Sequence, residues 1–255
     1  MKTLFKFLTA FLSLVYCFQA EASLNIYAVV VGVSDYQDDD LQIDLEYCDD
    51  DALLFYNQLI KSNVPSSNIR FLSDHKATRS AIITSVNYIF SKAQPSDQVI
   101  FYFSGHGGKG YFIPSDYTGY SNVLYHSEVK DLFKKCKANK KIFIADACFS
   151  GGIKSHTPKE IVKSSSAVSD VRIVVMMSSR DYQTSLEMRK FSHGVFTYFL
   201  VKGLTGLADK NNDKIITVSE MYYYTKENVI LETDKKQVPI IFGKFDRDMP
   251  ILYLR

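Results

Sequence analysis

The sequence predicts an α/β fold built around a mainly parallel sheet. Short apolar runs bounded by turn or charged residues recur along the chain, which is typical of strands buried on both faces. Segments whose apolar residues follow helical spacing lie between these runs, and this alternation indicates helical crossovers between parallel strands. The chain has 255 residues, of which 46% are hydrophobic, and this is enough to bury a sizeable core.

The first residues carry a separate signal. Lys2 and Lys6 begin a basic start that leads into an apolar run at 7–18, and the small-x-small motif Ala-Glu-Ala follows at 20–22. This order predicts a secretory signal peptide, residues 1–22, that is cleaved after Ala22. The apolar run is shorter than the roughly 20 residues that a membrane span needs, which favours a signal peptide over the alternative, an uncleaved anchor. We expect a secreted or periplasmic protein with one domain, residues 23–255, and no membrane span after cleavage.

Four segments are expected to form the buried parallel strands, and a weaker fifth accompanies them. They cover residues 26–33, 98–104, 141–146 and 172–178, with 68–73 as the weaker segment. Two short apolar runs, 238–242 and 250–254, end the chain.

Helices are expected between and after these strands. Residues 49–61 open with three carboxylates, which suit the positive end of a helix dipole. Thr78 and Ser127 are residue types that cap helix N-termini, and they begin the helical patterns 78–92 and 127–137. Further helical patterns cover 195–204 and 218–232. Residues 151–170 are rich in Ser and Lys without periodicity and therefore predict an exposed loop.

Charge and cysteine count narrow the class of function. The formal net charge is +2, so no global basic field argues for nucleic acid as a partner. Removal of the signal peptide leaves Cys48, Cys136 and Cys148, and an odd number means that at least one thiol cannot pair within the chain. In an exported protein such a cysteine is either a reactive thiol or a buried, inert residue.

Two of the expected strands lead into residues that carry chemistry. Catalytic groups in open α/β sheets gather beyond the carboxyl ends of the strands. The strand at 98–104 is followed by His106 between glycines, and the strand at 141–146 is followed by Cys148, with glycines next. If these strands are neighbours, the imidazole can take the thiol proton during attack and return one to the leaving amine. Backbone N–H groups of the glycine turns can stabilise an oxyanion, so the sequence predicts an acyl-transfer site.

Taken together, these motifs resemble those of the caspase-like cysteine peptidases. Ser-Gly-His-Gly at 104–107 and Asp-Ala-Cys-Phe-Ser-Gly at 146–151 are similar to the His and Cys motifs of that family. Further similar segments are 28–36, 48–52, 181–185 and 193–200. The resemblance implies a three-layer α/β/α sandwich and hydrolysis of peptide bonds by a dyad of Cys148 and His106. It also implies that the N–H groups of Gly107 and Cys148 form the oxyanion hole.

The residue two places before the nucleophile separates branches of the family. True caspases prefer Asp and carry Gln-Ala-Cys, whereas Asp146 precedes Ala-Cys here, which resembles the metacaspase and paracaspase branch that cleaves after Arg or Lys. The pocket implied by that branch consists of Cys48, Asp51, Ser104 and Asp146. A carboxylate at the base of a pocket attracts a guanidinium or ammonium group and repels Asp. The acidic region 35–51 adds charge that can steer basic substrates.

Two functional alternatives stay open at this stage. We expect a cysteine endopeptidase acting on protein or peptide substrates with basic residues, and we favour a monomer. The alternative is a catalytically silent caspase-like binding domain. Lys154, Lys159 and Lys163 lie in the expected loop after Cys148, where self-cleavage is our hypothesis and a plain surface loop is the alternative.

A second motif concerns calcium. Residues 209–220 match the twelve-residue EF-hand loop at five ligand positions, but position six is Lys214 where the motif has Gly. The matching residues are Asp209, Asn211, Asp213, Thr217 and Glu220. The alternative is a helix-connecting loop in which Thr217 caps the next helix. Many metacaspases need calcium at a separate acidic site, but their long acidic insertion after the catalytic His is missing here. We therefore expect no required cofactor and keep Ca²⁺ as the alternative for this loop.

Overall fold

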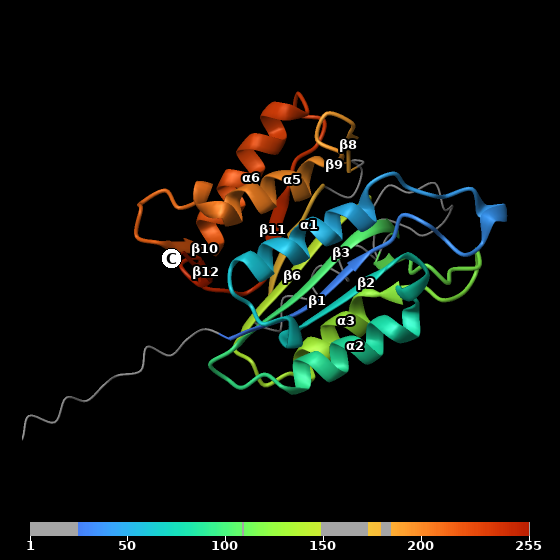
Figure 1. The fold of residues 1–255 in the computed structure, drawn as a ribbon, viewed down its shortest axis with the longest axis horizontal. Coiled ribbons are helices and arrows are strands. Elements are labelled where there is room, and N and C mark those ends of the chain that lie inside the picture. Colours follow the sequence, from blue (N-terminus) through green and yellow to red (C-terminus); the bar gives the residue numbers. More distant parts are fainter. Residues whose placement is uncertain (1–24, 109, 149–172, 180–184, 255) are drawn as a thin grey trace, which may run out of the picture.

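The computed structural model of the chain describes residues 25–108, 110–148, 173–179 and 185–254 (Figure 1). The expected signal peptide and the loop with Lys154, Lys159 and Lys163 lie outside the described residues. Export, cleavage after Ala22 and self-cleavage therefore stay predictions. Among the helices of the described residues, none has the length and apolar character needed to cross a membrane.

A mainly parallel sheet forms the centre of the fold. Its main path has the strand order β11-β7-β6-β3-β1-β2, and each neighbouring pair is parallel except β11 with β7. Two short strands, β4 (Tyr111–Phe112) and β5 (Leu124–Tyr125), extend from β3 as antiparallel pairs. The strands of the main path are β1 (Ile26–Gly32), β2 (Ile69–Ser73), β3 (Gln98–Gly108), β6 (Lys140–Cys148), β7 (Val174–Met177) and β11 (Ile240–Phe242). The expected parallel sheet is confirmed, including the weaker strand near residue 70.

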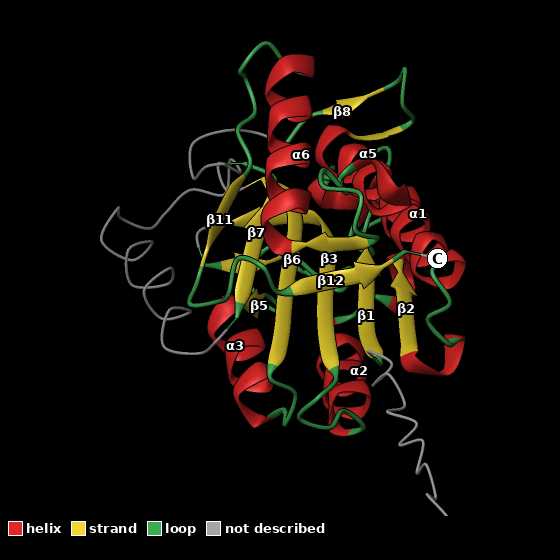
Figure 2. Ribbon diagram, turned by 90° about the vertical axis from the view of Figure 1, so that its left-hand side faces the viewer, coloured by secondary structure: helices red, strands yellow, loops and turns green. Residues whose placement is uncertain are grey.

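Helices cover both faces of this sheet, which confirms the three-layer sandwich (Figures 1 and 2). One face packs against α2 (Arg79–Ser91) and α3 (His126–Lys135). The other face packs against α1 (Cys48–Lys61), α5 (Val195–Lys202) and α6 (Val218–Glu232). A π-helical turn (Gly203–Leu207) follows α5, and two small sheets lie apart from the main one. They pair β8 (Glu187–Met188) with β9 (His193–Gly194) and β10 (Ile215–Thr217) with β12 (Pro250–Tyr253).

Alternation along the strands divides the core between the two faces. Successive side chains of a strand point to opposite faces, so a strand covered on both sides needs an apolar residue at every position. In β3, Phe101 and Phe103 belong to the cluster under α2 and α3. Ile100 and Tyr102 of the same strand belong to the cluster under α1, α5 and α6. The continuous apolar runs in the sequence are therefore the direct result of two covered faces.

Two strands and one helix differ from the prediction. β3 and β6 do not end at residues 104 and 146 but continue through His106 and Cys148, because the two strands keep pairing with each other up to these residues. The helix α3 begins at His126, so the prediction that Ser127 caps it was wrong. The N-cap position is instead occupied by Tyr125, whose backbone N–H donates to Glu128 Oε2 (3.0 Å) in the first turn of the helix.

Candidate active site

The residues predicted to form the dyad occupy opposite positions on neighbouring strands. β3 and β6 lie side by side in the sheet (Figure 2). They pair in parallel register without a shift, from Gln98 opposite Lys140 to His106 opposite Cys148. The predicted dyad required these two strands to be neighbours, and their pairing brings the two residues together at the backbone. The description of Cys148 is limited to its backbone, so the contact between its sulfur and the imidazole stays a prediction.

The surroundings of His106 fix the orientation of its ring. Its Nε2 lies 2.6 Å from the carbonyl oxygen of Ile43. A carbonyl oxygen only accepts hydrogen bonds, so Nε2 carries the proton and Nδ1 is the basic nitrogen of the neutral ring. Tyr36 holds the backbone, because its hydroxyl oxygen accepts the N–H of His106 (2.9 Å).

Burial determines the charge of this imidazole. Removal from water lowers the pKa of His106 below its usual value, although the hydrogen bond to Ile43 acts in the opposite direction. The ring is therefore neutral at pH 7, which is the form that accepts a proton. Ile43 could not be found from sequence, because it acts through its carbonyl group and any residue type provides one.

The two residues implied for the oxyanion hole lie at the same end of the sheet. Gly107 follows His106 in β3 and pairs with Phe112 in β4, while Cys148 is the last residue of β6. The N–H groups of Gly107 and Cys148 therefore belong to adjacent strand ends, and their role stays a prediction.

Asp51 and Asp146, the carboxylates predicted to confer specificity, come together on the face covered by α1 and α5. Both are almost fully buried, with exposed fractions of 1% and 4%. Ser104 donates from Oγ to Asp51 Oδ2 (3.1 Å), so three of the four predicted pocket residues are in one cluster. Gly194 lies between the carboxylates, because a Cβ atom added there would be 2.7 Å from Oδ2 of each.

Backbone and hydroxyl donors that the sequence did not reveal hold these carboxylates. Asp146 Oδ2 accepts hydrogen bonds from the N–H (3.1 Å) and Oγ1 (2.8 Å) of Thr197, and its Oδ1 accepts one from Ser185 Oγ. Asp51 Oδ1 accepts the N–H of Gly194 (3.0 Å) and lies 3.2 Å from Nδ1 of His193. The only sequence signal for these donors was the similarity of segments 181–185 and 193–200 to the family pattern.

Desolvation dominates the titration of both carboxylates. Burial raises the pKa of Asp51 to about 7, while the hydrogen bond from His193 lowers it and the charge of Asp146 raises it further. Burial also raises the pKa of Asp146, against hydrogen bonds from Ser185 and Thr197 that favour the charged form. Strongly perturbed acids of this kind are typical of functional sites, although structural networks also produce them.

Two further cysteines, Cys48 and Cys136, are poor nucleophiles. Cys48, the fourth predicted pocket residue, begins α1 and lies with its Sγ 3.6 Å from Glu187 Oε1. Burial raises the pKa of the Cys48 thiol well above its usual value. Cys136 donates to the carbonyl oxygen of Phe90 (3.4 Å), and burial raises the pKa of its thiol as well. Both are free, buried thiols that stay protonated at neutral pH.

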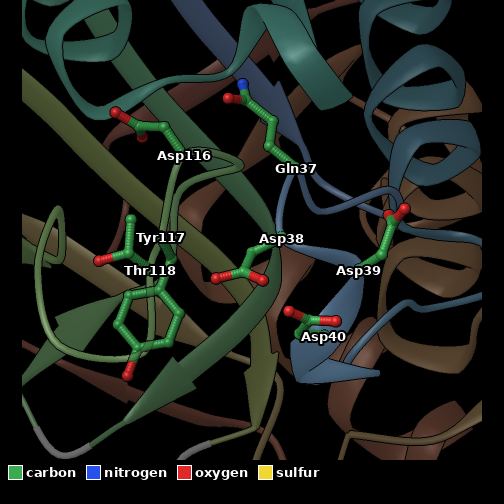
Figure 3. A pocket seen from close by; sticks show the side chains of 7 residues that line it. All are labelled: Gln37, Asp38, Asp39, Asp40, Asp116, Tyr117 and Thr118. Carbon is green, nitrogen blue, oxygen red and sulfur yellow. The ribbon is translucent and has the colours of Figure 1, made fainter.

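An acidic hollow adjoins the loop that orients His106. Figure 3 shows carboxylates from two loops around it, one following β1 and the other following β4. The residues that line it are Gln37, Asp38, Asp39, Asp40, Asp116, Tyr117 and Thr118. Asp116 also accepts the backbone N–H of Arg79 (2.8 Å), at the start of α2. Of the acidic region 35–51, Asp38, Asp39 and Asp40 line the hollow, whereas Asp51 is buried on the face covered by α1 and α5.

The predicted EF-hand loop lies elsewhere, between the π-helical turn and α6. Asp209 accepts the N–H groups of Asp213 (3.2 Å) and Lys214 (3.0 Å), and Lys214 adopts the left-handed conformation (φ 65°) that the motif expects of Gly. Thr217 caps α6 by accepting the N–H of Glu220 (3.2 Å), as the alternative interpretation expected. Asn211 accepts the N–H of Asp213 (3.1 Å).

Within the described part of the chain, no group of three or more His, Cys, Asp or Glu side chains is placed to hold a metal ion. Calcium binding by the loop at 209–220 stays a prediction.

Comparison with known proteins gives three findings. A family model described as a caspase domain matches residues 26–249. Metacaspase-1 of Candida albicans is 24% identical over 189 residues, which cover 61% of this chain and 41% of that protein. The chain thus spans about two fifths of the length of this curated relative. The crystal structure of a protein from Geobacter sulfurreducens has a TM-score of 0.63 at 16% identity, covering 91% of this chain and all of that one, and this likeness concerns the fold alone.

Replacement of Asp51 by Asn is expected to change how stability depends on pH. The pKa of Asp51 is about 7 in the folded chain, whereas an unfolded Asp titrates near pH ~3.9. Between these values the folded state binds the extra proton, so the contribution to stability is complete below about pH 4 and is lost as the pH rises to about 7. We expect the free energy of unfolding of the wild type to fall, relative to Asp51→Asn, by up to about 4 kcal/mol across this range.

Urea unfolding at several pH values measures this difference. Asp50→Asn, at an exposed position of the same helix, is the matched control and should follow the wild type. Parallel pH profiles of the wild type and Asp51→Asn would show that the carboxyl group is not perturbed.

Proposed function

Because the chain belongs to the caspase-domain peptidase family, we propose that it is an exported cysteine endopeptidase that cleaves after Arg or Lys through Cys148 and His106. The observation that carries the proposal is the strand pairing that sets His106 opposite Cys148. Family membership supports cysteine-type peptidase chemistry in general. The dyad, the preference for basic residues and export are our own additions.

The proposed reaction uses the nitrogen that the fold leaves free. As the sulfur of Cys148 attacks the peptide carbonyl carbon, Nδ1 of His106 takes the thiol proton. The N–H groups of Gly107 and Cys148 stabilise the oxyanion, and the imidazolium returns the proton to the leaving amine. Water then hydrolyses the thioester, with His106 acting as the base. The bond between Nε2 and Ile43 stabilises the imidazolium, because the carbonyl oxygen accepts from the charged ring as well as from the neutral one.

The place of the carboxylates supports the choice of a basic side chain. In the strand register, Ser104 lies opposite Asp146, two residues before His106 and Cys148. Two residues along a strand span about 7 Å, a distance that an extended arginine side chain can cover. A basic substrate side chain placed near Asp51 and Asp146 would compensate the negative charge of these two buried acids. An acidic substrate side chain would instead add a third acid to the site. The acidic hollow beside the loop at 36–43 supports electrostatic steering of basic substrates.

The dyad predicts which thiol reacts. A chloroacetamide probe should label Cys148 in the mature protein, and labelling should fall at least tenfold in His106→Ala, because the imidazole assists loss of the thiol proton. Mass spectrometry of the labelled peptides identifies the residue. Cys136→Ala is the control and should label like the wild type, because that thiol is buried. Equal labelling of the wild type and His106→Ala would contradict the proposed dyad and favour a catalytically silent binding domain.

Substrate specificity is expected to follow the carboxylates. Among peptides that differ only at the cleaved position, those with Arg or Lys should be hydrolysed and those with Asp should not. Asp146→Asn should lower kcat/KM for the Arg peptide by tenfold or more, because a charge-assisted hydrogen bond contributes about 1.5–3 kcal/mol. Asp131→Asn, on exposed helix surface, is the control. Cleavage after Asp, or equal cleavage after neutral residues, would refute the assignment.

Self-cleavage remains part of the proposal, although Lys154, Lys159 and Lys163 lie outside the described residues. Purified wild-type protein should be cut after one of these lysines during incubation, whereas Cys148→Ala should stay intact. Gel electrophoresis and mass spectrometry locate the cut. The hypothesis would be wrong if both proteins stayed equally intact, or if replacing all three lysines by Gln left the cut in place.

A further inference from the structure

The short hairpin formed by β8 and β9 places a histidine against a proposed specificity carboxylate. His193 Nδ1 lies 3.2 Å from Asp51 Oδ1, and the next residue, Gly194, donates its N–H to the same oxygen (3.0 Å). The side chain of Asp51 is 1% exposed, whereas that of His193 is 20% exposed. The imidazole therefore connects a buried carboxylate with the solvent.

The charges around Asp51 explain why this contact matters. In the part of the chain that the structure describes, the titratable groups that face it are Asp146 from β6, Cys48 from α1 and Tyr102 from β3, with Glu187 of β8 next to Cys48. All of these are acids, and each is neutral or negative. Of the groups named here, only His193 can carry a positive charge. A buried carboxylate without a cationic or hydrogen-bonding partner takes up a proton, and a protonated acid cannot attract the cation of a substrate.

We propose that His193 is a positioning residue for recognition of the basic side chain, orienting Asp51 and favouring its ionised form until the cation of the substrate compensates its charge. The inference rests on the proposed preference for Arg or Lys. When the guanidinium or ammonium group enters, its positive charge compensates the carboxylate, and the contact between His193 Nδ1 and Asp51 Oδ1 keeps the carboxylate oriented.

Loss of the contact between His193 and Asp51 should give a particular pH dependence. Removal of the imidazole leaves burial and Asp146 as the influences that raise the pKa of Asp51, so Asp51 binds its proton up to a higher pH. A variant without His193 therefore loses affinity for a cation around neutral pH. Above the pKa of its Asp51 the carboxyl is ionised again, and the affinity returns. A residue with a merely structural role would cost affinity at every pH.

The test measures binding by calorimetry on the mature Cys148→Ala protein, so that titration of the catalytic thiol does not contribute. The probes are an acetylated tetrapeptide that ends in arginine amide and its counterpart with citrulline, which has a similar shape and no charge. We expect His193→Gln to weaken binding of the arginine peptide about tenfold at pH 7, the scale of a charge-assisted hydrogen bond, and by less than about twofold at pH 9. Binding of the citrulline peptide should not change.

Controls separate the possible failures. His75→Gln replaces an exposed histidine of the turn after β2 and should behave like the parent protein. Equal or tighter binding of the arginine peptide by His193→Gln at pH 7, or an equal loss at every pH, would overturn the role of His193 alone. If the parent protein binds the arginine and citrulline peptides equally at every pH, the proposed preference for basic residues is refuted, independently of the role of His193.

Discussion

The parallel pairing of β3 with β6 is the constraint on which the rest of the site depends. A shift of one residue in this register would turn every side chain of one strand to the other face of the sheet. The aromatic core resists such a shift, because Phe101 and Phe143 are partners in the register and their rings stack with centroids 5.7 Å apart. The same register sets His106 opposite Cys148 five positions further on. The core packing that stabilises the sheet therefore also fixes the backbone geometry of the proposed dyad.

A second constraint is the burial of two acids beside each other. Asp51 and Asp146 lie on one side of the sheet, where burial makes ionisation unfavourable, and among the described residues hydroxyl, backbone and imidazole groups hold them. This compensation is incomplete for Asp51 and leaves its pKa at about 7, which supports the proposed preference for a basic side chain.

The sequence predicted those features that follow from local chemistry. Runs that are apolar at every position predicted the strands, because both faces of the sheet are covered, and Thr78 and Thr217 marked two helix starts correctly. Contacts between segments distant in the sequence could not be predicted. The extension of β3 through His106 depends on its partner strand, and the orienting group on Ile43 is a carbonyl that every residue carries. His193 gave no signal of its own, since its meaning depends on where the hairpin packs.

These contacts meet in one short stretch of chain, from the loop after β1 to the first turn of α1. Ile43 holds the ring of His106, and four residues later the N–H of Tyr47 is bound by Glu187 (3.1 Å), an anion at a helix N-terminus. One turn further, Asp51 contacts His193 of the same hairpin. The carbonyl that orients His106 and the proposed specificity carboxylate therefore belong to one continuous stretch of backbone, which the hairpin contacts at Tyr47 and at Asp51. The position of the hairpin thus bears on both parts of the proposed site.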